Sequence, residues 1–273
     1  MRSLKSLMLM FGVNLLFVVV LSAVLVVFHI QMHLVGFALL FGFGGAFFFL
    51  FLSKWLVKRM FHMVQVRQGD AGVNGQLWQM VAETAQKAVL PMPEIWLYAD
   101  DRPNAFATGA TRHSAMIAVS TGLLGIMDAN ILRSVLGHEM GHIANGDMLS
   151  TTLLMGLMNS YVIWMGNLAG RYLGNNVLTQ LVITIAFEIG LSFLALIPIT
   201  AFSRHREYGA DAFSARLWGK ESMISALLRL ERAPVDVNPR KDVLATSYIH
   251  GPMGGLFATH PSMEKRIAAI RAL

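Results

Sequence analysis

The sequence contains no cysteine and few charged residues. Without cysteine, disulfide bonds and thiolate metal ligands are excluded, and this composition agrees with a reducing compartment. Charged residues make up 14% of the 273 residues and hydrophobic residues 55%, whereas a soluble domain carries about 25% charged residues. The composition therefore indicates a membrane protein rather than a soluble one.

The apolar residues are concentrated in four blocks, and each is long enough to cross a bilayer core as a helix. Residues 7–30 and 34–56 follow each other closely and predict a transmembrane hairpin in place of a cleaved signal peptide. Residues 149–169 and 177–202 contain more polar residues, so full spans and a hairpin in the interface are both compatible with them. We favour spans, which gives about four transmembrane helices. Glu188 lies in the fourth block, where an ionisable side chain is a functional candidate unless it sits near a helix end.

Most lysine and arginine residues near these blocks occur at the block ends that would lie on the same side of a membrane. They are Arg2, Lys5, Lys54, Lys58, Arg59, Arg67, Arg204 and Arg206. The turns on the other side hold only Arg171. The positive-inside rule therefore predicts that both termini and the polar segments lie in the cytoplasm. The net charge of +6 suits an anionic lipid surface, and a nucleic-acid partner is not expected because no basic patch with interleaved aromatic residues occurs.

Two polar segments, residues 57–148 and 203–273, remain between and after the hairpins. We do not expect either segment to form a complete domain alone. We therefore expect the two to fold together as a single α+β domain that the hairpin of residues 149–202 interrupts. Apolar periodicity and Gly/Pro punctuation predict its elements. These are helices at 75–88, 128–147, 202–218 and 261–272, strands at 94–98, 104–108 and 115–120, and a loop at 234–255. Pro261 suits the first position of the last helix.

The motif His138-Glu139-Met140-Gly141-His142 contains candidate residues for metal binding and catalysis. Residues four apart project from the same face of a helix, so both imidazoles can bind one Zn²⁺. Glu139 stays on that side, where its carboxylate can take a proton from a water molecule that zinc activates. The alternative is two solvated or core histidines that bind no metal.

A catalytic zinc site normally has a third protein ligand, and the residues after the fourth block offer candidates. Glu207 and Asp211 share a helix face, while His205 points away from it. Glu207 can serve as the ligand and Asp211 as a hydrogen-bond acceptor for a histidine N–H. An exposed acidic helix face that binds nothing remains the alternative on spacing alone.

Several motifs together resemble the HtpX family of bacterial membrane metalloproteases, which is distantly related to the type I CAAX prenyl endoproteases. The motifs are His138-Glu139-x-x-His142 with Asn145-Gly146-Asp147, Ser203-Arg204-x-Arg206-Glu207-Tyr208-x-Ala210-Asp211, Asn104-Ala105-Phe106-Ala107 and Thr259-His260-Pro261. The resemblance covers nearly the whole chain and the order of its segments. It implies a gluzincin-like domain with one Zn²⁺, and it assigns Glu207 as the third ligand.

The resemblance also implies an inner-membrane zinc metalloendopeptidase that cleaves misfolded membrane proteins in stress and quality control. A histidine in the place of His260 would donate a hydrogen bond to the oxyanion, although a plain helix cap is the alternative. A strand containing Asn104, Ala105 and Phe106 would pair with an extended substrate, unless it is only a core strand. The loop of residues 234–255 is a candidate lid, and an oligomer is compatible with the sequence.

Three other functions compete with this interpretation. An intramembrane protease is disfavoured because polar residues surround the zinc motif. A transporter with a structural zinc is disfavoured because the spans contain few polar residues and structural sites are usually rich in cysteine. An inactive, chaperone-like protein is disfavoured because Glu139 is present.

Overall fold

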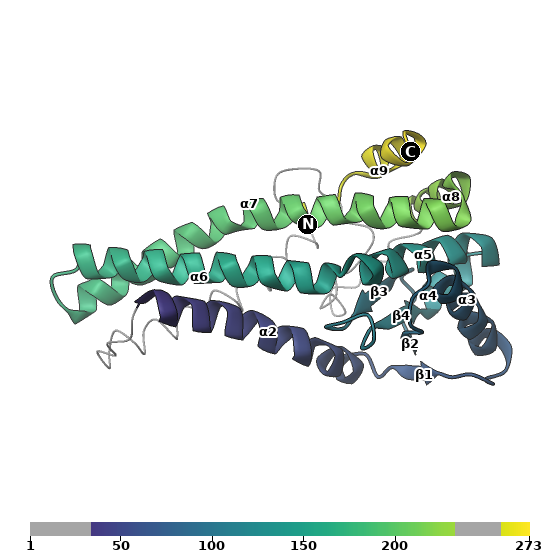
Figure 1. Ribbon diagram of the computed structural model, residues 1–273, viewed down its shortest axis with the longest axis horizontal. Helices are drawn as coiled ribbons and strands as arrows, with labels where there is room; N and C mark the ends of the chain where they lie inside the picture. Colours follow the sequence, from purple (N-terminus) through teal and green to yellow (C-terminus); the bar gives the residue numbers. More distant parts are fainter. Residues whose placement is uncertain (1–33, 233–257) are drawn as a thin grey trace.

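The computed structural model describes residues 34–232 and 258–273 of the chain. It is elongated, with long helices side by side at one end and a mixed domain at the other (Figure 1). The predicted span at residues 7–30 and the predicted loop at 234–255 lie outside the described residues.

Three helices form the long end: α2 (Leu34–Met60), α6 (Asp147–Leu173) and α7 (Val177–Trp218). Within the described part of the chain, these three are long and apolar enough to cross a membrane. They contain the three apolar blocks predicted at 34–56, 149–169 and 177–202. With its 42 residues, α7 is about 63 Å long, so it reaches well beyond a hydrocarbon core of about 30 Å.

The long helices pack closely through small residues. A Cβ atom on Gly42 of α2 would lie 2.1 Å from the hydroxyl of Ser160 on α6, so glycine is needed at this contact. Between α6 and α7, Gly166 faces Glu188, whose side chain is fully buried. Glu188 therefore lies inside the helix pair and not near a helix end.

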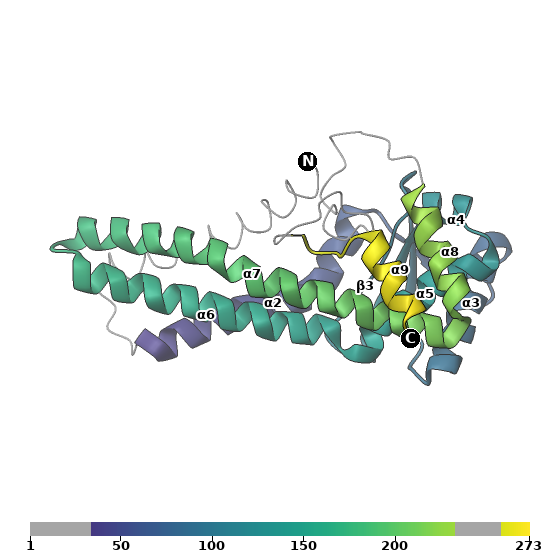
Figure 2. The same ribbon diagram turned by 90° about the horizontal axis from the view of Figure 1, so that it is seen from above.

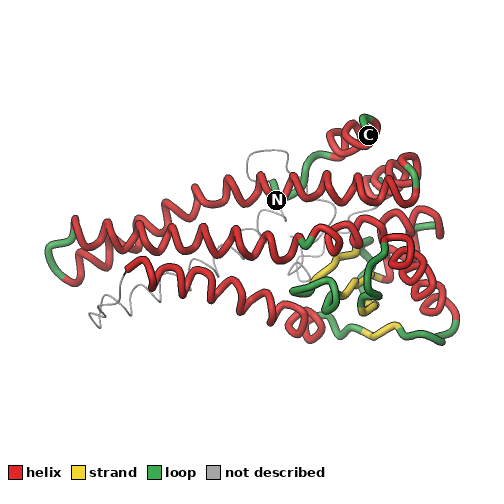
Figure 3. Tube along the Cα trace, in the orientation of Figure 1, coloured by secondary structure: helices red, strands yellow, loops and turns green. Residues whose placement is uncertain are grey.

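The mixed domain combines short helices with a small sheet, which Figure 3 shows gathered at one end of the molecule. The helices are α3 (Gly72–Ala88), α4 (Thr121–Ile126), α5 (Ala129–Asn145), α8 (Lys220–Glu231) and α9 (Met263–Arg271). The strands are β1 (Val64–Val66), β2 (Glu94–Tyr98), β3 (Ala105–Thr108) and β4 (Met116–Ser120), in the order β1-β2-β4-β3. Only β2 and β4 run parallel; the other two pairs are antiparallel.

Both faces of β4 are covered, because all five of its residues are buried. Ile117 and Val119 join the main core with residues of α3 and α5. Met116 and Ala118 point the other way, where Val57 at the end of α2 packs against them. The sheet therefore lies between the zinc-motif helix and the end of a membrane helix.

Segments on both sides of the α6–α7 hairpin share the core of this domain. Ala226 and Leu230 of α8 belong to the same cluster as the residues of α3 and α5. A second cluster joins Ala215 of α7, Leu227 of α8 and Ile270 of α9. The C-terminal polar segment therefore packs onto the segment that precedes the hairpin.

Several predicted boundaries are wrong for local reasons. The helix predicted at 128–147 ends at Asn145, because Gly146 adopts a left-handed conformation with φ of 68° and α6 starts directly after it. The last helix starts at Met263 and not at Pro261, since the Ser262 hydroxyl caps it by accepting the Lys265 N–H. The predicted fourth span and the helix after it are one continuous helix, α7.

Three elements were not predicted. Strand β1 has three residues, which is too short to show alternation. Helix α4 has six residues and begins directly after β4. Helix α8 is separated from α7 only by Gly219.

Candidate metal centre

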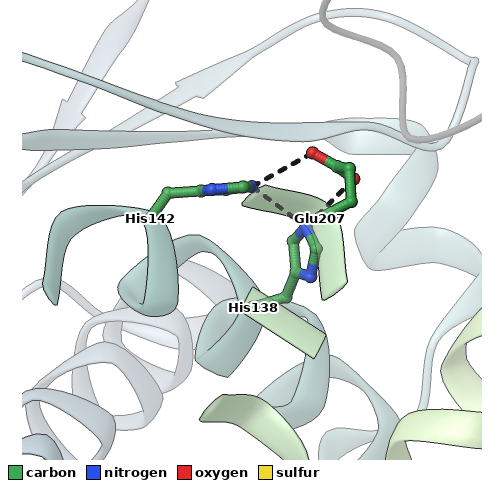
Figure 4. A group of neighbouring side chains, drawn as sticks. All are labelled: His138, His142 and Glu207. Carbon is green, nitrogen blue, oxygen red and sulfur yellow. Dashed lines mark hydrogen bonds and ion pairs between the residues drawn. The ribbon is translucent and has the colours of Figure 1, made fainter. Parts of the chain in front are cut away.

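Helices α5 and α7 cross at very short range, and this crossing builds the site. A Cβ atom on Gly141 would lie 2.9 Å from the Cα atom of Ala210. Glycine within the zinc motif therefore lets α7 approach the helix that carries both histidines. The contact brings His138 and His142 of α5 next to Glu207 of α7 (Figure 4).

The candidate ligand atoms converge at distances that suit one metal ion. The Nε2 atoms of His138 and His142 are 3.2 Å apart. Glu207 places Oε2 3.7 Å from the His138 Nε2 and Oε1 3.4 Å from the His142 Nε2. Tetrahedral zinc with bonds of about 2.0–2.1 Å requires ligand atoms about 3.3 Å apart. The three side chains therefore fit a zinc ion without a large movement.

A carboxylate contacts the Nδ1 atom of each histidine, on the side of the ring away from Nε2. The Nδ1 atom of His138 lies 2.9 Å from Oδ1 of Asp211, and that of His142 lies 2.6 Å from Oδ2 of Asp147. A carboxylate only accepts hydrogen bonds, so each Nδ1 donates and each Nε2 is the nitrogen that can bind a cation. The two Nε2 atoms are 3.2 Å apart, so a cation between them, either a proton or a metal ion, prevents repulsion between their lone pairs. This donor set therefore fits a metal ion.

The negative charge around the site favours a cation there. Burial disfavours a charged His142, but hydrogen bonds to Asp147 and Glu207 outweigh this cost and raise the pKa of His142 to about 10. The charge of Glu139 acts in the same direction. A metal ion that binds here would replace the proton on His142.

Glu139 and His260 are brought to the same region. Glu139 is buried on α5 beside His138. His260 places Nδ1 2.9 Å from Oε2 of Glu207. The segment that carries His260 is tied to α7, because the Arg204 guanidinium donates to the carbonyl of Ala258 at 2.7 Å.

The predicted substrate strand is β3, which lies at one edge of the sheet. Asn104 precedes it and is fully buried, and its side-chain amide donates to the Tyr98 hydroxyl at 2.9 Å. Ala105 and Phe106 are also buried. The edge position suits strand pairing with a peptide, while the side chain of Asn104 packs into the domain.

Two residues of the site were not singled out as functional from the sequence. Asp147 follows the zinc motif by five residues, and the turn at Gly146 directs it back to His142. Arg266 of α9 is fully buried against Asp211. The helix end signalled by Gly146 could have indicated Asp147, whereas no local pattern marks Arg266. By contrast, His205 is exposed, whereas Glu207, two residues later, is buried.

Comparisons with known proteins agree with this geometry. The family model described as peptidase family M48 matches residues 72–273. Protease HtpX of Thioalkalivibrio sulfidiphilus is 37% identical over 98% of this chain and 99% of its own length. Protease HtpX of Pasteurella multocida is 38% identical over 95% of this chain and 97% of its own length.

A solved structure shares the fold. The crystal structure of S. mikatae Ste24p aligns with a TM-score of 0.66 and 16% sequence identity, covering 92% of this chain. This chain spans 61% of the length of that structure. Because the sequence identity is low, the likeness concerns the fold alone.

These matches confirm the resemblance to the HtpX family. They also argue against a transporter or a chaperone-like protein with structural zinc, because the matched family is one of peptidases. Together with the three apolar helices, they show that the chain belongs to peptidase family M48 and is a membrane metalloprotease similar to Protease HtpX.

Proposed function

We propose that the chain is a zinc-dependent endopeptidase of the bacterial inner membrane that cleaves misfolded or damaged membrane proteins. The observation that carries this proposal is the convergence of His138, His142 and Glu207 at distances suited to one metal ion. Both helices that supply these residues continue into, or directly precede, a candidate membrane span. A peptidase site in this position suits substrates that leave the bilayer.

Zinc is the proposed metal because the ligand set consists of two imidazoles and one carboxylate, which is a common catalytic zinc set. The chain has no cysteine, so a thiolate-rich structural site is excluded. One negative ligand leaves the ion with net positive charge. When bound, zinc would lower the pKa of a water molecule toward about 7 and polarise the scissile carbonyl group.

The side chains around the ion then share the proton transfers. Glu139 accepts a proton from the attacking water and passes it to the leaving amine. Its burial beside His138 supports this role, because a dry site strengthens electrostatic interactions. His260 donates a hydrogen bond to the developing oxyanion, which its place beside Glu207 supports.

We propose that the substrate binds in an extended form along the edge strand β3, which carries Ala105 and Phe106. Main-chain hydrogen bonds between strands depend little on the side chains of the substrate. This suits a protease that acts on many misfolded proteins. Asn104 would support the strand through its bond to Tyr98.

The orientation proposed for the domain is cytoplasmic, with both termini on that side. Lys58 and Arg59 lie at the end of α2 next to the domain, as the positive-inside rule requires for a cytoplasmic face. The partners proposed are therefore membrane-protein substrates and the lipid bilayer.

The decisive experiment replaces Glu139 with glutamine in the full-length protein. Cleavage of casein or an unfolded membrane protein should fall by about 100- to 10,000-fold, because general acid–base catalysis is lost. Zinc content, measured by elemental analysis, should stay at the wild-type level. Glu83→Gln is a matched control, since Glu83 on α3 pairs with Arg133 outside the site. Cleavage at the wild-type rate by the Glu139→Gln variant would exclude the proposed general base.

A further inference from the structure

Arg266 is the largest fully buried side chain of the described residues, with no exposed surface. A guanidinium stays charged in proteins, and such a group is almost never fully buried unless it is paired. It lies on α9, which follows the segment that carries His260 and sits beside α7 at the domain end (Figure 2).

The partners of Arg266 are the acidic residues of the metal centre. Its Nε and Nη2 atoms lie 2.7 Å and 2.6 Å from the two carboxylate oxygens of Asp211, which is a bidentate pair. Its Nη1 atom lies 3.5 Å from Oε2 of Glu207. Its Nη2 atom also lies 3.5 Å from Nδ1 of His138. One side chain thus touches the candidate metal ligand, the histidine and the histidine's partner.

The acidic pair on α7 needs such a partner. Glu207 and Asp211 lie four residues apart on one helix face, and both are buried. Like charges at this spacing repel, and burial makes each charge costly. Arg266 supplies a permanent positive charge from a different helix, while Oε2 of Glu207 also contacts Nδ1 of His260 at 2.9 Å.

Arg266 lies closer to Asp211 than to Glu207, and this difference indicates different roles for the two carboxylates. The close, two-point contact fixes Asp211 in the orientation in which its Oδ1 accepts the His138 N–H. The longer contact to Glu207 leaves both of its oxygens facing the two histidines. Because a planar fork matches a carboxylate in two places, lysine could not reproduce this geometry.

We propose that Arg266 is a positioning residue of the metal centre, which fixes the His138 ring through Asp211 and lets Glu207 bind the metal as a buried anion. The proposal rests on the proposed zinc site. It makes the C-terminal helix a part of that site, because one short segment supplies both His260 and Arg266.

The test measures metal binding in the full-length protein. In Arg266→Gln, zinc affinity from chelator competition should fall by about 10- to 100-fold, the range for loss of a group that orients a metal ligand. The visible spectrum of the Co²⁺-loaded protein should change, because the ligand geometry changes. Arg266→Lys keeps the charge without the fork, so its zinc affinity should fall by about tenfold, at the low end of the same range.

Arg133→Gln is the matched control. Arg133 lies on the zinc-motif helix but pairs with Glu83, and its side chain is 27% exposed. This variant should keep wild-type zinc affinity and the wild-type cobalt spectrum. Wild-type values of both in Arg266→Lys would overturn the proposal, and this result can be read even when Arg266→Gln does not fold.

A double-mutant cycle tests whether Arg266 acts through Asp211. Because the two residues form one unit, Arg266→Lys combined with Asp211→Asn should lose less zinc affinity than the sum of the two single losses. Losses that simply add would overturn the proposed route. The cycle needs no substrate, so absence of peptidase activity in the wild type would overturn the proposed function and leave this test intact.

Discussion

The two histidines of the candidate metal centre each have an aspartate partner, but the two aspartates come from very different places in the chain. His142 is held by Asp147, five residues further along the chain. His138 is held by Asp211, which is 73 residues away on α7. The exposed fractions differ as well: 3% and 2% for the His138–Asp211 side chains, against 13% and 7% for His142–Asp147.

This difference divides the site into a local half and an assembled half. The His142 half needs only the end of α5, the turn at Gly146 and the start of α6. The His138 half needs α7, which returns from the far end of the α6–α7 hairpin, and α9, which supplies Arg266. Glu207 joins the halves, because it contacts both histidines. The proposed metal binding by all three ligands therefore depends on the hairpin being in place.

Removal of Glu207 should have the largest effect on this comparison. In Glu207→Ala both halves lose their shared ligand, so zinc affinity should fall by more than the roughly 100-fold that marks the upper range for groups behind the ligands. Elemental analysis and chelator competition measure this loss. Glu231→Ala is the control, because Glu231 is an exposed carboxylate at the end of α8. Unchanged zinc content in Glu207→Ala would assign the third ligand position to another residue.

Substitution of either aspartate should lower zinc affinity less than the loss of Glu207, and the two substitutions compare the two halves directly. Asp211→Asn should lower zinc affinity by about 100-fold and Asp147→Asn by about tenfold, within the range for partners of metal-bound histidines. The larger loss at Asp211 has a physical reason, since this change also leaves the fully buried Arg266 without its closest anion. Both variants keep a side-chain oxygen that can accept the histidine N–H. Equal losses in the same titration would show that the assembled half has no special role.

The same division explains what could be predicted from the sequence. The zinc motif is local, and its spacing of four residues alone places His138 and His142 on one helix face. The apolar blocks at 34–56, 149–169 and 177–202 predicted α2, α6 and α7. A run of about 20 apolar residues indicates a membrane-spanning helix without any information on distant contacts. The strands at 94–98, 104–108 and 115–120 were found within one residue of β2, β3 and β4.

Features that depend on contacts between distant segments could not be predicted in this way. Glu207 emerged from spacing only as one candidate, and the family resemblance was needed to select it. Arg266 lies in an ordinary Glu-Lys-Arg stretch of α9, and only the packing of α9 against α7 buries it. Glycine at position 141 carries no periodic signal, although it decides how closely α5 and α7 approach.

Gly141 gives the smallest and most selective test of the comparison. In Gly141→Ala the new Cβ atom would meet the backbone of Ala210, so α5 and α7 must separate slightly. We expect a loss of about 1–3 kcal/mol in the free energy of unfolding, the usual cost of overpacking. Separation of α5 from α7 weakens the His138–Asp211 half, which spans the two helices, and leaves the His142–Asp147 half intact. Zinc affinity should therefore fall less than in Asp211→Asn.

The matched control for this substitution is Gly190→Ala. Gly190 lies on α7, is exposed, and has open space around the position of a new Cβ atom. Alanine there should be neutral or slightly stabilising, because it favours the helix. Thermal unfolding and zinc titration of the two variants measure the difference. If Gly141→Ala behaved like Gly190→Ala, the close crossing of α5 and α7 would not be what holds the assembled half together, and the division into two halves would have to rest on Arg266 alone.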